Sequence, residues 1–334
     1  MTNMKTIKVK FLDFWPSFNV NENFIINRLK KYANVVLVDE NPDYLFYTSM
    51  CPDLSKYQCV RIFYNVENYS PDFNICDYAI GFDEISFNDR YIRYPLYLIT
   101  DYQYYPGDDY ARDFRNMEGK TDFTMEELKA KENFCGMVVS RGGCPDRDNF
   151  FEQLCEYKKV LSGGAWKNNI GGKRVDDKFK FLNSCKFSIA FENSSTPGYC
   201  TEKLMQAFAA RTIPIYFGDP HVGEQFNTQA FVNVHDFDSW EDVIHRIEEI
   251  DNNNALYLSM IQTPALKDGY KKMKEDELDA FFANIVNQDV DSAIRRHGQV
   301  VEFYELRYKF FMKAWTYRVK VSKLLKPIER ILGK

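Results

Sequence analysis

The sequence predicts an α/β fold made of two domains, each with its own open parallel sheet. Short apolar runs flank a helical pattern at residues 7–15, 19–32 and 35–38, which gives the order strand, helix, strand. The same alternation begins again at residues 134–140, after a stretch without apolar periodicity. A chain of 334 residues, 45% hydrophobic and 27% charged, is long enough for two ordinary globular domains.

The first half of the chain is predicted to form one such sheet. Further strands are expected at residues 44–48, 60–65 and 78–82, with polar loops at their carboxyl ends. Open parallel sheets bind ligands beyond the carboxyl ends of their strands. Glu67 follows the strand at 60–65 and therefore lies at such an edge. On the residues alone, a solvated glutamate in a polar surface loop is the alternative interpretation.

The second half repeats this architecture. Residues 100–132 lose apolar periodicity and gather Tyr, Asp, Gly and Lys, so we place the interdomain connection there. We expect one Rossmann-like domain at residues 1–120 and a second at 121–290, followed by a helical basic amphipathic tail at 291–334.

An arginine begins the first predicted helix of the second domain. This helix covers about residues 147–158, and Arg147 lies in its first turn. The positive end of a helix dipole disfavours a cation at that place, so Arg147 indicates a compensating anion. A guanidinium matches diphosphate oxygens well. The alternative is a local ion pair with Asp146 or Asp148.

Residues 186–219 form the central stretch of the chain. They predict a strand, a polar loop, a helix that begins near Thr201 and a second strand at 212–217. The Thr201 hydroxyl is expected to accept a hydrogen bond from a first-turn N–H, which places Glu202 and Lys203 in that turn. Helix N-termini attract anions, and a lysine adds a full positive charge where a diphosphate would bind. The alternative is a capped helix whose Glu and Lys are merely solvated.

The strongest signal is a set of motifs in a fixed order. They are FENS at 191–194, Tyr199, TEK at 201–203 and IPIYFG at 213–218, preceded by DFW at 13–15, DYAIGFD at 77–83, DRY at 89–91 and PLY at 95–97. This order resembles the α1,3/4-fucosyltransferases, glycosyltransferase family ten, and most closely their bacterial members. The resemblance spans most of residues 7–240. It implies the GT-B fold, an inverting reaction and GDP-fucose as the donor substrate.

The resemblance also implies roles for particular residues. Glu67 matches the family's glutamate in an N-x-E segment, the base that takes the proton of the acceptor hydroxyl. Arg147 matches an arginine that contacts the donor diphosphate. Whether Lys167 or Lys173, in the glycine-rich segment 160–173, contacts the donor stays open. The other residues expected to hold the nucleotide-sugar are Asn193, Tyr199, Glu202 and Lys203.

No metal or other cofactor is expected. The Asp-x-Asp spacing at 236–238 is typical of metal-dependent transferases, but it occurs at two other places in the chain, and capping of the helix predicted at 240–250 explains it. The eight cysteines lack C-x-x-C spacing, so we expect neither zinc nor an obligatory disulfide. Cys200, in the loop before Thr201, is expected to be reachable by thiol reagents.

Charge is distributed unevenly along the chain. The net charge is −5, but residues 306–334 hold nine Lys/Arg and one Glu, a net +8 that leaves −13 for residues 1–305. An acidic body argues against non-specific nucleic-acid binding. Apolar residues at steps of three and four in the basic end predict an amphipathic helix, for which we expect an anionic membrane surface as partner. Docking on the acidic body and a coiled-coil dimer seam are the alternatives.

The sequence therefore predicts an enzyme of a defined class. We expect an inverting α1,3-fucosyltransferase that moves fucose from GDP-fucose to the 3-hydroxyl of GlcNAc in N-acetyllactosamine-type glycans of a surface polysaccharide. Because no signal peptide and no apolar window of membrane-spanning length is found, we expect a cytoplasmic protein on the inner face of the cytoplasmic membrane. The alternatives are another GDP-sugar or an α1,4 linkage, and a catalytically silent carbohydrate-binding protein.

Overall fold

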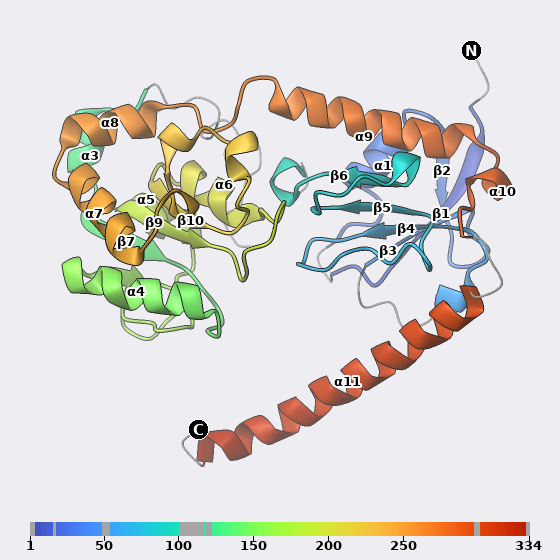
Figure 1. Cartoon of the computed structure of the whole chain (residues 1–334). Helices are drawn as coiled ribbons and strands as arrows, with labels where there is room; N and C mark the ends of the chain where they lie inside the picture. The colour runs from blue at the N-terminus through green and yellow to red at the C-terminus, as the bar shows by residue number, and fades with distance from the viewer. Residues whose placement is uncertain are drawn as a thin grey trace. The chain divides into compact units, whose positions relative to one another are not determined.

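The chain folds into two compact units, each with its own parallel sheet. The computed structural model describes residues 4–15, 18–48, 54–99, 117, 122–296 and 301–331, with the backbone alone at residues 319 and 322–331. The first unit comprises Met1–Gly81, Ile85–Tyr94 and Asp276–Lys334, and the second comprises Phe82–Glu84 and Pro95–Glu275. Figure 1 shows the two sheets. The α/β class predicted from the sequence is confirmed.

In the first unit, the described strands form a six-stranded parallel sheet in the order β2-β1-β3-β4-β5-β6. Every residue of β3, β4 and β5 is buried, which is the pattern of strands covered on both faces. The strands are β1 (Thr6–Leu12), β2 (Asn34–Leu37), β3 (Tyr44–Tyr47), β4 (Val60–Tyr64), β5 (Tyr78–Gly81) and β6 (Tyr91–Arg93), with short 3₁₀ turns at Leu54–Lys56 and Asn88–Arg90.

Helix α1 (Phe24–Leu29) lies within the helical pattern expected at 19–32, and Asn23 caps its start. The Oδ1 atom of Asn23 accepts a 2.9 Å hydrogen bond from the Ile26 N–H. A carboxylate from much later in the chain then pairs with this region, because Asp279 accepts 2.8 Å bonds from Arg28 of the helix and from Lys31 just after it. The first unit is therefore completed by residues that follow the second unit in the sequence.

In the second unit, the described strands form a five-stranded parallel sheet in the order β11-β10-β9-β7-β8. The strands are β7 (Asn133–Met137), β8 (Val160–Ser162), β9 (Cys185–Phe191), β10 (Ile213–Phe217) and β11 (Val232–Asn233). The helices are α3 (Met125–Lys129), α4 (Pro145–Tyr157), α5 (Lys178–Asn183), α6 (Glu202–Ala209), α7 (Trp240–Asp251) and α8 (Asn254–Gln262). One apolar core, which includes Phe150, Phe187 and Ile215, packs most of these elements together.

The limits of the compact units differ from the domains expected at 1–120, 121–290 and 291–334. The main segment of the second unit starts at Pro95, and Tyr97 is fully buried in it and donates a 2.6 Å hydrogen bond to Gln225. It ends at Glu275, within helix α9 (Tyr270–Asn287). The later turns of α9 belong to the first unit, where Phe282 is fully buried beside Phe46.

The C-terminal segment contains the short helix α10 (Val290–Ala293) and the long helix α11 (Val301–Ile331), drawn in red in Figure 1. The first turns of α11 dock on the first unit. Glu305 accepts a 2.5 Å bond from the fully buried Arg61, and Arg307 pairs with Asp72 at 3.0 Å. One of the alternatives from the sequence, docking on the acidic body, therefore holds for these turns. No helix in the described part of the chain is long and apolar enough to cross a bilayer.

We predict that Glu305→Ala destabilises the first unit by about 3 kcal/mol, because removing one partner of a buried ion pair leaves the other charge uncompensated. Urea denaturation of the full chain measures the change. Glu302→Ala, at an exposed position one turn earlier on α11, is the matched control and should change the unfolding free energy by less than about 0.5 kcal/mol. Equal effects of the two variants would contradict the structural role of the Arg61–Glu305 pair.

Candidate active site

The carboxyl edge of the second sheet has two neighbouring loops at the point where the strand order reverses. Strand β7 pairs with β8 on one side and with β9 on the other. The connection that follows β7 therefore runs toward one edge of the sheet, and the connection that follows β9 runs toward the opposite edge. Ligands of open parallel sheets bind at such a reversal. The loop after β7 leads to Arg147 in α4, and the loop after β9 begins with Glu192 and Asn193.

Glu192 connects the end of β9 to the start of α6. It is fully buried, and its carboxylate accepts 2.7 Å and 2.9 Å bonds at Oε1 from the N–H and the hydroxyl of Thr201. The hydroxyl also lies 2.7 Å from Oε2, where the Lys203 ammonium donates a 2.8 Å bond. The loop that contains Tyr199 is closed at its base by these contacts.

Thr201 is the N-cap residue of α6, as predicted, but the expected capping bond is absent. Its side chain makes no hydrogen bond to a first-turn N–H. The hydroxyl instead lies against the Glu192 carboxylate and accepts a 3.0 Å bond from Lys203. A charged acceptor forms stronger hydrogen bonds than a neutral one, which explains why Glu192 engages this hydroxyl.

The charges around Lys203 are strongly coupled. Burial alone would lower the pKa of Lys203, but Glu192 and Glu202 raise this pKa well above its ordinary value. Burial raises the pKa of Glu192, an effect that Lys203 opposes. Against the effect of burial, Lys203 and then Lys178 lower the pKa of Glu202. Lys203 therefore stays protonated at neutral pH, and its positive charge is shared between two carboxylates, 2.8 Å from Glu192 and 3.7 Å from Glu202.

Arg147 and Asn193 lie together at the same edge. The Arg147 side chain is only 2% exposed, and its Nη1 donates a 3.4 Å bond to Oδ1 of Asn193. Its Nη2 donates a 2.9 Å bond to the main-chain carbonyl of Arg141. The alternative of a local ion pair is weakly met, because Asp148 lies 4.0 Å from Nε of Arg147. Neutral acceptors thus provide most of the contacts of this buried guanidinium.

Tyr199 packs into the interior of the second unit. The residue is 2% exposed, and its ring meets the ring of Phe82 edge-on at 4.9 Å. Its carbonyl accepts a 3.4 Å bond from the hydroxyl of Tyr216, and the neighbouring Gly198 N–H is bound by Asp219 at 2.8 Å. Cys200 is only 1% exposed, so the expectation that thiol reagents reach it is wrong, because its side chain is buried in the fold.

Glu67 lies in the first unit, whereas the other five predicted site residues lie in the second. It is exposed in the loop after β4. Asn65 orders this loop, since its Oδ1 accepts a 3.0 Å bond from the Glu67 N–H and its Nδ2 donates a 2.6 Å bond to the Glu67 carbonyl. The asparagine of the N-x-E segment therefore supports the backbone that carries the carboxylate.

Comparison with known proteins identifies the family. The model described as the α-(1,3)-fucosyltransferase FucT N-terminal domain matches residues 9–100, and that of glycosyltransferase family 10 (fucosyltransferase), C-terminal part, matches residues 128–275. A crystal structure of an α1,3-fucosyltransferase with GDP is 30% identical and superposes with a TM-score of 0.71, covering 89% of this chain and 94% of that one. The chain belongs to glycosyltransferase family 10.

Relatives within family 10 differ in how much of their length the chain matches. The α-(1,3)-fucosyltransferase FucT of Helicobacter pylori is 32% identical over 320 residues, which cover 85% of this chain and 66% of the relative. The mouse 4-galactosyl-N-acetylglucosaminide 3-α-L-fucosyltransferase 9 is 37% identical over 139 residues, 40% of this chain and 37% of that protein. The chain thus spans less than two thirds of these curated relatives. The likeness to the solved α1,3-fucosyltransferase also bears out the predicted GT-B-like fold.

The glycine-rich segment of this family 10 chain owes its glycines to local structure. A Cβ on Gly164 would lie 1.9 Å from the carbonyl oxygen of Val139, so the two backbones meet there without room for a side chain. Lys167 forms an ion pair with Glu152. The side chain of Lys173 is 80% exposed and pairs with Asp176 at 2.9 Å. Whether either lysine contacts a donor stays open.

Residues at the Asp-x-Asp segment, 236–238, make local contacts, and the capping predicted for the following helix is made by Ser239. Ser239 caps α7 by accepting a 3.2 Å bond from the Asp242 N–H. Asp236 accepts a 2.8 Å bond from the side chain of Asn233.

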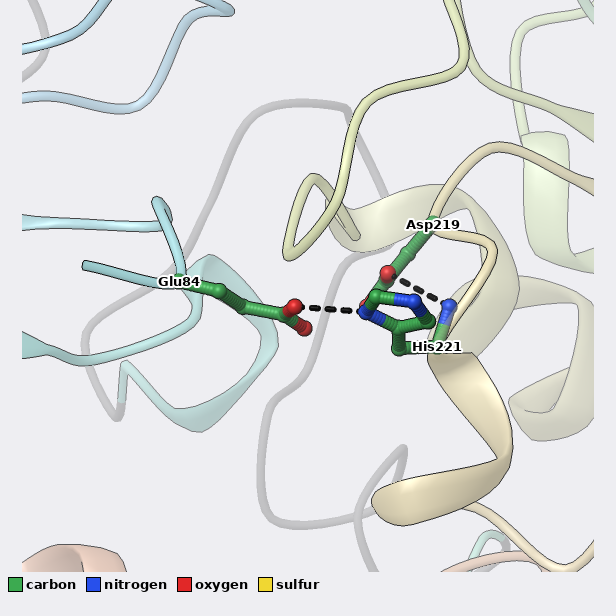
Figure 2. Close-up of side chains that lie close together, drawn as sticks. All are labelled: Glu84, Asp219 and His221. Atoms are coloured by element: carbon green, nitrogen blue, oxygen red, sulfur yellow. Dashed lines mark hydrogen bonds and ion pairs between the residues drawn. The ribbon is translucent and has the colours of Figure 1, made fainter.

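A group that the sequence did not indicate offers three possible metal ligands. Glu84, Asp219 and His221 each place one oxygen or nitrogen within 4.8 Å of the others (Figure 2). Glu84 Oε2 lies 2.6 Å from Nδ1 of His221, and this contact raises the pKa of His221. The Asp219 carboxylate already accepts bonds from the N–H groups of Gly198 and His221 and from the side chain of Gln225. Hydrogen bonding accounts for this arrangement, and the absence of a metal stays a prediction.

Sequence reasoning missed Glu192, whose carboxylate binds both Thr201 and Lys203. It belonged to the FENS motif but received no role of its own. The available signal was a charged residue placed directly after the apolar residues Phe187, Ile189 and Phe191, at the end of a strand whose last five residues are all buried. A carboxylate at such a position requires partners from elsewhere in the fold.

Proposed function

We propose that this chain is an inverting α1,3-fucosyltransferase that moves L-fucose from GDP-fucose to the 3-hydroxyl of GlcNAc in an N-acetyllactosamine-type glycan of a surface polysaccharide. The observation that carries the proposal is the pair of neighbouring loops in a family 10 chain, one bringing Arg147 to Asn193 and the other holding Lys203. Solved α1,3-fucosyltransferases that are 30% and 31% identical to this chain hold GDP and GDP-fucose, which supports the same donor here.

The donor diphosphate binds at the carboxyl edge of the second sheet. Arg147 is the better available cation, because its closest contacts are a carbonyl and an amide oxygen. A guanidinium donates two parallel bonds to phosphate oxygens, which fixes orientation as well as charge. Lys203 adds a second positive charge, and Asn193, Tyr199 and Glu202 complete the donor site. These groups stabilise the negative charge that develops on the departing GDP.

Glu67 acts as the general base. The carboxylate takes the proton of the acceptor 3-hydroxyl while that oxygen forms a bond to the anomeric carbon of fucose. The bond from this carbon to the diphosphate breaks, and its electron pair leaves with GDP. Attack from the face opposite the leaving group inverts the β-linked donor to an α-linked product. Two features of the first unit support this role, the exposure of Glu67 at a strand's carboxyl end and the ordering of its loop by Asn65.

We predict that Glu67→Gln lowers the transfer rate by about 10²- to 10⁴-fold while the dissociation constant of GDP-fucose stays unchanged, because the amide keeps the shape of the side chain but cannot accept the proton. Release of GDP in the presence of N-acetyllactosamine measures turnover, and calorimetry measures donor binding. Glu40→Gln, at an exposed glutamate elsewhere in the first unit, is the matched control. Wild-type turnover by Glu67→Gln would remove this residue from the mechanism.

We further propose that the reaction needs no metal, since Arg147 and Lys203 supply positive charge to the leaving group. Transfer activity should therefore be unchanged after treatment with EDTA and removal of the chelate. Loss of activity that Mn²⁺ or Mg²⁺ restores would contradict this. In that case Glu84→Gln and His221→Asn would show whether the group in Figure 2 binds the ion.

We propose that the exposed turns of α11 bind an anionic membrane surface, which would place the enzyme on the inner face of the cytoplasmic membrane. Large apolar side chains on these turns are 40–74% exposed, among them Leu306, Phe310 and Tyr317. Exposed cations lie among them at Lys313, Arg318 and Lys320. Apolar and basic side chains together are typical of helices that lie in a membrane interface.

Full-length protein should sediment with vesicles that contain phosphatidylglycerol, and replacing Lys313, Arg318 and Lys320 by Glu should reduce the bound fraction at least about tenfold, since each basic residue near an anionic surface contributes about 1 kcal/mol. The matched control replaces three exposed lysines away from α11, Lys30, Lys129 and Lys159, by Glu. Equal binding to neutral phosphatidylcholine vesicles, or an equal loss in the control, would show that the charges of α11 do not direct binding.

A further inference from the structure

The Glu192 carboxylate is committed entirely to the start of α6. Its hydrogen bonds go to the N–H and the hydroxyl of Thr201 and to the Lys203 ammonium. The Thr201 hydroxyl also accepts a bond from Lys203, so the ammonium is tied to Glu192 both directly and through Thr201. With no solvent exposure, Glu192 has no contact with water that would replace these partners.

The space around Glu192 is closely fitted. The Glu192 N–H donates a 2.8 Å bond to the carbonyl of Phe217, which fixes its backbone against β10. A Cβ on the next residue, Gly218, would lie 2.5 Å from Cγ of Glu192 and 2.6 Å from the Tyr216 hydroxyl oxygen. The side chain is therefore held in one position by contacts from β10 as well as from α6.

The titratable neighbours of Lys203 come from three elements. Glu192 lies at the end of β9, Tyr199 lies in the following loop, and Glu202 precedes Lys203 on α6. Lys178 of α5 acts on Glu202 and lowers its pKa. If the charge of Glu192 were removed, Glu202 would be the remaining carboxylate that opposes the effect of burial on the pKa of Lys203.

We propose that Glu192 is a positioning residue for donor binding, which fixes the Lys203 ammonium by a direct ion pair and through Thr201 without touching the donor itself. This inference rests on the proposed function, in which Lys203 binds the diphosphate. Glu192 determines where that positive charge stands, and as a carboxylate 2.8 Å away it favours the protonated form of Lys203.

The test is the variant Glu192→Gln in the whole chain. GDP binding is measured by calorimetry at about pH 7.5 and at about pH 9.5, because an ordinary lysine begins to lose its proton between these two values. An amide keeps the shape but turns an N–H group toward the ammonium or toward the Thr201 N–H. We expect GDP to bind at least about tenfold more weakly at the lower pH. The wild type should show little further change at the higher pH, whereas the variant should lose affinity, because the pKa of Lys203 falls when Glu192 no longer raises it.

Lys203→Ala separates this inference from the proposed function. If Lys203→Ala leaves GDP affinity unchanged, the diphosphate does not bind at Lys203 and the placement of the donor is overturned. If Lys203→Ala weakens binding and Glu192→Gln does not, the role of Glu192 alone is overturned. If both weaken binding, the double variant decides. A positioning role predicts little loss beyond Lys203→Ala, whereas additive losses would show that Glu192 acts independently of Lys203.

Two variants control for damage to the fold. Asp219→Asn changes an equally buried carboxylate that binds Gly198, His221 and Gln225 in the neighbouring loop. It should lower the melting temperature without making GDP binding weaken at alkaline pH. If Glu192→Gln fails to fold, Thr201→Val removes the bridging hydroxyl while Glu192 remains. We expect a loss of GDP affinity of about three- to tenfold from Thr201→Val, and wild-type affinity in this variant would overturn the proposal.

Discussion

Burial of one carboxylate constrains the carboxyl edge of the second sheet. Glu192 ends β9 without solvent exposure, so the chain itself must supply the donors that water would otherwise provide. Thr201 and Lys203 supply them across the intervening loop, which fixes where that loop closes and where α6 begins. The same constraint explains a glycine at position 218, since a side chain there would occupy the space of Glu192.

The two cations at this edge differ in how they are held. Lys203 is surrounded by carboxylates, so its position is fixed and much of its charge is balanced within the protein. Arg147 is buried against a main-chain carbonyl and the amide of Asn193, and its ion pair with Asp148 is long at 4.0 Å. An anion that binds here therefore meets Arg147, whose charge is little balanced by carboxylates of the protein. It also meets Lys203, whose position is fixed before the anion binds. Fixed donors of this kind need no reorganisation when charge develops on a leaving group.

Much of the fold was predictable from the sequence because it depends on local signals. Apolar runs marked β1 to β5, and Asn23 and Ser239 cap α1 and α7 as their positions indicate. Helix α9 was missed although residues 278, 281, 282, 285 and 286 carry apolar side chains at helical spacing. The sequence gives no direct sign that these later turns complete the first unit, because this depends on contacts such as Asp279 with Arg28, 251 residues apart.

The candidate site was predictable to a smaller extent, for a related reason. The spacing of Thr201, Glu202 and Lys203 placed them correctly at a helix start, and Arg147 correctly in the first turn of α4. What spacing does not contain is the competition between partners. Thr201 has the right position to cap α6, but a buried carboxylate from β9 is the stronger acceptor partner for its hydroxyl, and only the tertiary structure brings the two together.

Helix α11 shows the same limit of pattern reasoning in a second place. Tyr308 and Met312, four residues apart, are buried in the core of the first unit, whereas Leu306 and Phe310, also four residues apart, are exposed. Both pairs satisfy helical spacing, so the sequence alone does not separate the docked stripe from the exposed one. The buried Arg61 makes the distinction, because its charge requires Glu305 and so fixes the rotation of the helix about its axis. The exposed stripe is thereby held on the first unit in a defined orientation, available to a surface outside the chain.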